Sequence, residues 1–160
     1  MRKKASSLLV ALSLVCSCTP FCANADSYDS YSANDIITSY NEYYDDGSYS
    51  IVTIIEHPTG SLRSVKEGSK IYEHIVSGNT VWTYTIDASF SYNGSSSSCT
   101  SVSDSYTISN SNWHLNSRYH WKSGNTAYGS VTMDRKLLGF TVESVTRDLT
   151  LSCSANGTLS

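Results

Sequence analysis

The sequence of 160 residues has few apolar runs and few of the motifs that mark common catalytic sites. Its longest apolar stretch, Ser7 to Cys18, is shorter than the roughly 18 to 20 residues that a membrane-spanning helix needs. No Gly-x-Ser-x-Gly motif occurs, and no segment after residue 48 has a convincing helical period. These absences argue against a membrane-spanning helix and against a hydrolase with its serine on a strained strand-to-helix turn.

The first 25 residues have the three parts of a secretory signal peptide. Residues 2–4 supply positive charge, residues 7–18 form the apolar part, and Ala23-Asn24-Ala25 is a cleavage site of the small-x-small type. The sequence therefore predicts export with removal of residues 1–25. The alternative is a lipoprotein anchored through Cys18, which the residues before that cysteine disfavour.

Cysteine is scarce in the rest of the chain, where only Cys99 and Cys153 occur. Two cysteines in an exported protein predict one disulfide. A bridge across about 55 residues would stabilise the fold by on the order of 4 kcal/mol in the loop-entropy model. A reactive or metal-binding thiol pair is disfavoured, because neither cysteine belongs to a Cys-x-x-Cys motif or has a neighbouring histidine.

Lysine and arginine are absent between residues 26 and 60, and residues 26–160 together carry a net charge of −6. An acidic chain without a basic stripe repels phosphate groups, so we expect no nucleic-acid partner, disfavour anionic lipid and expect no stable membrane insertion. Solubility outside the cell explains the acidity. Residues 26–47, rich in Tyr, Ser and Asp, predict a flexible acidic arm, either a solvated tail or an interaction arm with tyrosine contacts.

Residues 48–160 predict one folded domain in which apolar and polar side chains alternate with period two. The alternation is clearest from Thr80 to Tyr92, and the following Asn93-Gly94 is typical of a two-residue hairpin turn. That register places Cys99 opposite Ala88. The fold class is therefore all-β, with an antiparallel β-sandwich or partly open barrel as the architecture.

Later segments show the same alternation. It runs through residues 113–121 and 127–133, with a turn at residues 123–125 between them. A phase slip near Ser144 predicts a β-bulge or bend. Cys153 shares its phase with the apolar residues before it, so both cysteines are expected to face the core.

Candidate catalytic groups are few. His114 and His120 lie about 20 Å apart on an extended strand, too far to share a metal ion. No metal or cofactor is expected. Acidic residues on different predicted strands leave open a hydrolase that uses two carboxyl groups. They are Asp87, Asp104, Asp134, Glu143 and Asp148.

Trp113, Tyr119 and Trp121 are the candidate binding residues. Coplanar aromatic rings on one strand face can stack on sugar rings while their polar groups contact water. Two tryptophans and a tyrosine on one face would suit a polysaccharide. The alternative is that these rings pack in the core against the Trp82 face.

Several motifs between residue 80 and the C-terminus are also informative. They include Trp82-Thr-Tyr-Thr-Ile, Phe90-Ser-Tyr-Asn-Gly, Asn112-Trp113 and Leu149-Thr-Leu-Ser-Cys153-Ser-Ala-Asn-Gly. In these motifs the chain resembles a group of small secreted proteins from Gram-positive, gut-type bacteria. The resemblance implies export, paired cysteines and a β-rich domain, and no activity.

The sequence thus favours a secreted, non-enzymatic protein that binds cell-wall or extracellular glycan or a protein partner. A small secreted glycan hydrolase and a bacteriocin-like effector are the alternatives.

Overall fold

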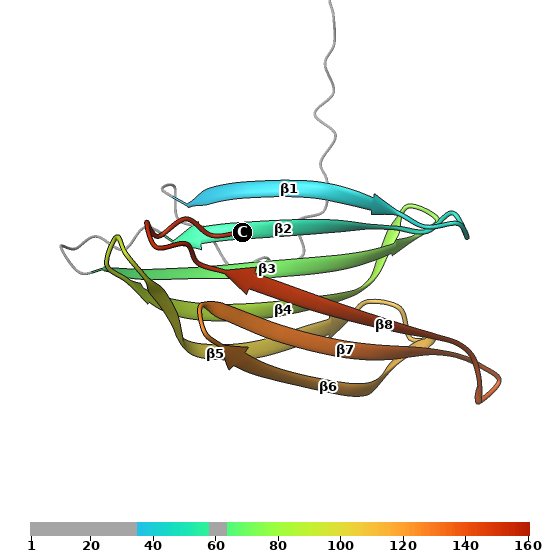
Figure 1. Ribbon diagram of the computed structural model, residues 1–160. Coiled ribbons are helices and arrows are strands. Elements are labelled where there is room, and N and C mark those ends of the chain that lie inside the picture. The colour runs from blue at the N-terminus through green and yellow to red at the C-terminus, as the bar shows by residue number, and fades with distance from the viewer. Residues whose placement is uncertain (1–34, 58–63) are drawn as a thin grey trace, which may run out of the picture. The chain divides into compact units, whose positions relative to one another are not determined.

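The computed structural model describes residues 35–57 and 64–160, which belong to one compact unit, Tyr31–Ser160. This part of the chain is all-β, as predicted, and its strands form two antiparallel sheets (Figure 1). The predicted signal peptide and residues 26–34 of the predicted arm lie outside the described residues. The strands are β1 (Ile36–Tyr43), β2 (Tyr49–His57), β3 (Val65–Val76), β4 (Asn79–Tyr92), β5 (Ser97–Ile108), β6 (Trp113–Ser123), β7 (Thr126–Leu137) and β8 (Phe140–Ser152).

Both sheets are meanders in which each strand pairs with its neighbour in sequence. The larger sheet has the order β1-β2-β3-β4-β5, and the smaller sheet has the order β6-β7-β8. The smaller sheet packs face to face on β3, β4 and β5, which gives a sandwich-like architecture (Figure 1). Strands β1, β5, β6 and β8 are therefore the edge strands.

Residues 36–43, which the sequence assigns to a flexible arm, form β1 instead. This strand pairs with β2 along its whole length, from Ile36 opposite Glu56 to Tyr43 opposite Tyr49. Every residue of β1 is exposed, so the strand lacks the apolar alternation that reveals a half-buried strand. Backbone hydrogen bonds rather than burial hold β1, and the folded part begins before residue 48.

The core lies between β4 and the smaller sheet. The predicted alternation of β4 is confirmed, because Trp82, Tyr84, Ile86 and Phe90 are all 0% exposed. The residues of the smaller sheet that join them in the core are Trp113, Ala127, Val131, Met133, Leu149 and Leu151. Full burial of a Val, Leu, Ile, Phe or Met side chain stabilises a fold by about 1.5 to 3 kcal/mol.

Gly129 marks a point of very close approach between the sheets. A Cβ atom at this position would lie 2.3 Å from Cγ2 of Ile86 and 2.7 Å from the hydroxyl oxygen of Tyr84. Both distances are shorter than real Cβ contacts. The absence of a side chain on Gly129 therefore lets β7 pack directly on β4.

The β4–β5 hairpin differs from the predicted two-residue turn. Tyr92 pairs with Ser97, and Cys99 lies opposite Phe90 rather than Ala88. The connection is longer because the side-chain oxygen of Asn93 accepts hydrogen bonds from the backbone of the loop that follows. An Asx turn of this kind replaces the tighter hairpin turn.

The predicted bulge in the last strand is present, two residues before Ser144. Lys136 pairs with Thr141 and Arg135 pairs with Glu143, so Val142 has no partner on β7.

The predicted disulfide is not formed in the structure. Cys99 and Cys153 are both buried, as predicted, but both thiols are free. Each thiol instead donates to a nearby backbone carbonyl, with Cys99 Sγ lying 3.3 Å from the oxygen of Ser101. The backbone N–H groups of the two cysteines bond to neighbouring carbonyls, those of Gly124 and Asn125. The β6–β7 turn, rather than a covalent bond, links Cys99 of β5 to Cys153, which directly follows β8.

We expect Gly129→Ala to destabilise the protein by about 1 to 3 kcal/mol, because an added methyl group overpacks a tight core. Urea unfolding followed by circular dichroism measures this change. Thr132→Ala, on the outward face of the same strand, is the control and should change stability by at most about 0.5 kcal/mol. Equal stability of the two variants would contradict the close approach of β7 to β4.

The thiols of residues 26–160 should both react with iodoacetamide after unfolding without a reductant. In the folded protein the reaction should be slow, because burial raises the pKa of both thiols and the thiolate is the reactive form. Mass spectrometry counts the added groups, and Cys99→Ser should take one. Labelling of the unfolded chain only after reduction would show that the two cysteines are bridged.

Candidate functional site

A β-bulge in β6 divides the predicted aromatic triplet between two faces. The pairing of β6 with β7 shifts register at Asn116, which has no partner on β7. Trp113, before the bulge, is 3% exposed, whereas Tyr119 and Trp121, after it, are 59% and 42% exposed. Trp113 therefore packs in the core, and Tyr119 and Trp121 lie on the outward face of the smaller sheet.

Tyr128 of β7 adds a half-buried ring to this exposed pair, because it pairs with Trp121 across the β6–β7 hairpin. The Trp121 and Tyr128 rings have centroids 4.9 Å apart and planes inclined by 6°. The Tyr119 and Trp121 rings have centroids 5.4 Å apart and planes inclined by 21°. We call Tyr119, Trp121 and Tyr128 the aromatic ladder. The pairing of outward positions across the Gly124 turn is the signal that identifies Tyr128.

The rings of the aromatic ladder are stacked rather than coplanar. With planes about 3.5 to 4 Å apart, the centroid distance between Trp121 and Tyr128 corresponds to a sideways offset of about 3 Å. The offset and the exposure of Tyr119 and Trp121 leave part of the ring surfaces open to solvent. The ladder therefore offers apolar ring surface and phenolic hydroxyl groups side by side.

Polar side chains surround the aromatic ladder on the same face. Ser130 pairs with Tyr119 across β6 and β7, and its hydroxyl donates to Asp148 Oδ1 at 2.6 Å. Next to Tyr128, the hydroxyl groups of Thr126 and Ser152 are 2.9 Å apart. Ser130 is itself only 2% exposed. The exposed carboxylate of Asp148 and the half-buried hydroxyl groups of Thr126 and Ser152 are therefore the groups that can bond to the hydroxyl groups of a ligand.

A charged cluster lies behind the ladder, where β6 meets the edge strand β5. Asp104 accepts from His120 Nδ1 at 2.5 Å and from Arg118 Nη1 at 3.2 Å. The Asp104 side chain is 6% exposed, against 40% for His120 and 37% for Arg118. The guanidinium of Arg118 also lies 5.0 Å from the ring centroid of Tyr106. These contacts close the open edge of the sandwich and hold β6 in place.

The sequence pattern does not predict this charged cluster. Alternation counted from Trp113 assigns His120 and Arg118 to the polar, solvent-facing side of β6. The bulge reverses this assignment, because His120 pairs with Gly129 and Arg118 with Val131, both on the core-facing side of β7.

The five acidic residues singled out from the sequence do not include two placed for glycosidase chemistry. Asp134 and Asp148 share the outward face of the smaller sheet, but they lie four pairs apart along β7. That separation is about 13 Å by strand rise, beyond the roughly 9.5 Å that such enzymes use. Glu143 lies on the opposite face of that sheet, Asp104 lies between the sheets, and Asp87 bonds to Ser69 on the larger sheet.

His74 of β3 is a buried titratable group, 1% exposed. Its ring stacks on Trp82 at 5.0 Å and meets Trp113 edge-on at 5.4 Å. Nδ1 lies 3.3 Å from the hydroxyl of Tyr72, and Nε2 has no hydrogen-bond partner among the described residues. Burial, assisted by the positive charge of Arg147, lowers the pKa of His74 to about 4. A neutral imidazole within aromatic rings has a structural role.

Residues 35–57 and 64–160 hold no group of three His, Cys, Asp or Glu side chains arranged for a metal ion. The same residues contain no helix that is long and apolar enough to cross a membrane. Comparison of the chain with known protein families, curated proteins and solved structures gives no match. The candidate site therefore depends on its own geometry.

We expect the protein to lose stability as the pH falls from about 6.5 to 4. The unfolded chain binds a proton at His74 in this range and the folded chain does not, so the free energy of unfolding decreases by about 3 kcal/mol from this residue. Urea unfolding at pH 7, 5.5 and 4 measures the change. His74→Gln should show a smaller decrease, and an unchanged decrease would contradict the role assigned to His74.

Proposed function

We propose that the protein is a secreted, non-enzymatic binding protein whose aromatic ladder holds a polysaccharide of the cell wall or extracellular matrix. The observation that carries the proposal is the outward stack of Tyr119, Trp121 and Tyr128 on one sheet face. Aromatic side chains normally contribute to stability by being buried. Tyr119 and Trp121, which are exposed and stacked with the half-buried Tyr128, instead provide surface for a ligand.

The chemistry of the face favours a sugar polymer. The C–H surface of a sugar ring packs on an aromatic ring, and its hydroxyl groups need polar partners at the rim. Asp148, Thr126 and Ser152 supply such partners beside the ladder. A neutral glycan is compatible with a chain whose residues 26–160 carry a charge of −6.

Two other features support this proposal. The outward face of the smaller sheet ends at β6, because β6 is an edge strand of that sheet, so a long chain can extend past the ladder without meeting a further strand of that sheet. The predicted signal peptide, residues 1–25, would place the protein where such polymers occur. No specific contact favours the hydrolase or the bacteriocin-like alternative.

Residues 26–160 should sediment with at least one of purified cell wall, cellulose or chitin, and binding should saturate. Trp121→Ala should weaken this binding by about 10-fold or more, because it removes a central aromatic contact of about 1.5 to 3 kcal/mol. The bound fraction is measured at increasing polysaccharide concentration. Circular dichroism checks that the variant is folded.

Phe140→Ala is the matched control, since Phe140 is 75% exposed on the same sheet but lies outside the aromatic ladder. This variant should bind polysaccharide as the unchanged protein does. Absence of binding to every polysaccharide, or equal loss in both variants, would contradict the proposal.

A further inference from the structure

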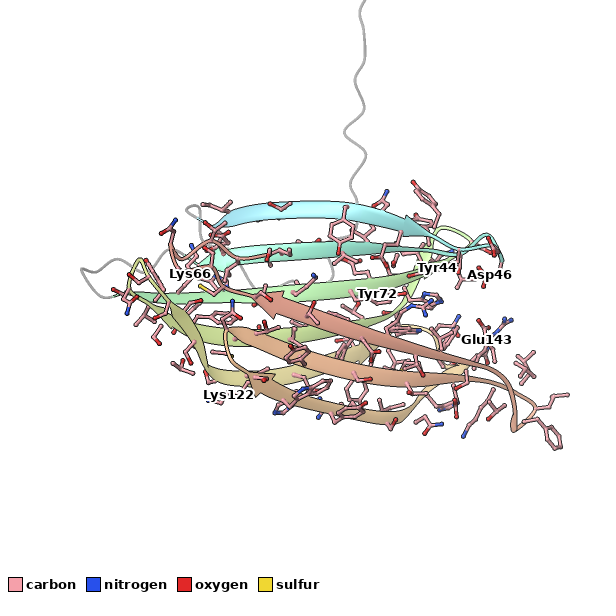
Figure 2. All side chains as sticks on the ribbon, in the orientation of Figure 1. Tyr44, Asp46, Lys66, Tyr72, Lys122 and Glu143 are labelled. Atoms are coloured by element: carbon pink, nitrogen blue, oxygen red, sulfur yellow. The ribbon has the colours of Figure 1, made fainter. Side chains whose placement is uncertain are left out.

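The β7–β8 hairpin ends in a group of apolar side chains that no other part of the described chain covers. Leu138 is 98% exposed, Phe140 is 75%, Val142 is 54% and Leu137 is 42%. We call these four residues the apolar tip. The hairpin projects beyond the neighbouring strands in Figure 1, and its side chains extend away from both sheets in Figure 2. The tip is thus a convex knob rather than a groove.

The backbone of the tip is strained at its most exposed residue. Leu138 has φ of 51° and is followed by Gly139 at 84°, between the paired residues Leu137 and Phe140. Such a turn favours Asn or Gly at both central positions, because a bulky side chain clashes in the left-handed region. The β3–β4 hairpin makes the same turn with Ser77 at 52° and Gly78 at 78°.

Leu138 is therefore unfavourable for two reasons. Its apolar side chain is exposed to water, and its backbone is in a conformation that leucine disfavours. Neither choice stabilises the fold. Strained residues without a packing benefit cluster at functional sites, which makes Leu138 a candidate functional residue.

Cationic side chains lie directly below the tip. Lys136 is the only lysine or arginine within residues 35–57 and 64–160 whose side chain has no hydrogen bond or ion pair. Arg135 precedes Lys136 on the same strand and forms an ion pair with Glu143, with Nη1 lying 3.4 Å from Oε2. By strand rise, Lys136 lies about 7 Å from the end of the hairpin. That distance matches the 5 to 10 Å depth to which interfacial segments enter a bilayer.

We propose that the apolar tip inserts into the interfacial layer of a phospholipid bilayer, with Lys136 facing the lipid phosphates. A convex apolar surface can be buried either in a complementary pocket of a partner protein or in a fluid apolar phase that rearranges around it. The interior of a bilayer is such a phase. The cation next to the apolar residues fits the order of acyl chains and phosphates in a lipid leaflet. The overall acidity of the chain opposes binding to anionic lipid. Residues 135–142, at the end of this hairpin, nevertheless contain two cations and no acidic residue, and Lys136 is the cation that Glu143 does not neutralise.

The contact is reversible and peripheral. Four side chains bury too little area to anchor the protein permanently. The tip lies on a different part of the smaller sheet from the aromatic ladder, so lipid binding and polysaccharide binding are separable properties.

The test is flotation of residues 26–160 with phosphatidylcholine vesicles, with and without one quarter phosphatidylglycerol. These residues include the whole compact unit that begins at Tyr31 and omit the apolar part of the predicted signal peptide, which would bind lipid itself. The protein should float with both kinds of vesicle. Leu138→Asn should lower the partition coefficient about 10-fold or more, and Lys136→Gln should lower it by up to about fivefold.

Leu138→Asn should also keep or raise the thermal unfolding midpoint, because Asn relieves the strained turn. Loss of lipid binding in this variant is then not a loss of folding. Ser77→Asn, in the matching turn of the β3–β4 hairpin, is the control and should leave lipid binding unchanged. Leu138→Asn should bind polysaccharide normally, which separates this proposal from the one above.

Phe140→Trp gives a second readout, a blue shift of its emission on vesicles and quenching by brominated lipid. No flotation, unchanged flotation of Leu138→Asn, or no emission shift would overturn the proposal. A dimer that Leu138→Asn converts to a monomer, without vesicle binding, would also overturn it and identify a second copy of this chain as the occupant.

Discussion

The packing of β4 on β7 is the contact on which the rest of the structure depends. Tyr84 and Ile86 fill the space above Gly129, and the sheets approach so closely there that no side chain fits. This contact sets the position of the smaller sheet over β3, β4 and β5. The aromatic ladder and the apolar tip both belong to the smaller sheet, so the contact between β4 and β7 also determines the direction in which they face.

The bulge at Asn116 then decides the chemistry of β6. Before it, Trp113 contributes to the core around His74 and Trp82. After it, the same alternation turns Tyr119 and Trp121 to solvent and directs charged residues toward β5. One unpaired residue thus allows a single strand to serve the core at one end and a candidate binding surface at the other.

Sequence patterns predict those parts of the fold that are buried on one face. The alternation in β4 and β7 is regular because each strand has one face in the core and one facing outward, and the pattern therefore predicts the burial of Trp82 to Phe90 correctly. β1 has no buried face, so its sequence does not alternate between apolar and polar residues. The bulge at Asn116 changes the face of every later residue in β6, and the sequence around it contains no glycine or proline that marks the change. The loop at Asn93 is longer than the predicted two-residue turn because the side chain of Asn93 accepts backbone hydrogen bonds from Ser95 and Ser96.

The accessibility of the three tryptophans tests most directly whether β6 changes face. Oxidation of the folded protein with N-bromosuccinimide, followed by peptide mass spectrometry, reports which indole rings are exposed. The structure predicts rapid modification of Trp121 and protection of Trp82 and Trp113, which are 0% and 3% exposed. Equal modification of Trp113 and Trp121, or protection of both, would mean that the two residues share a face and that the bulge and the aromatic ladder do not exist.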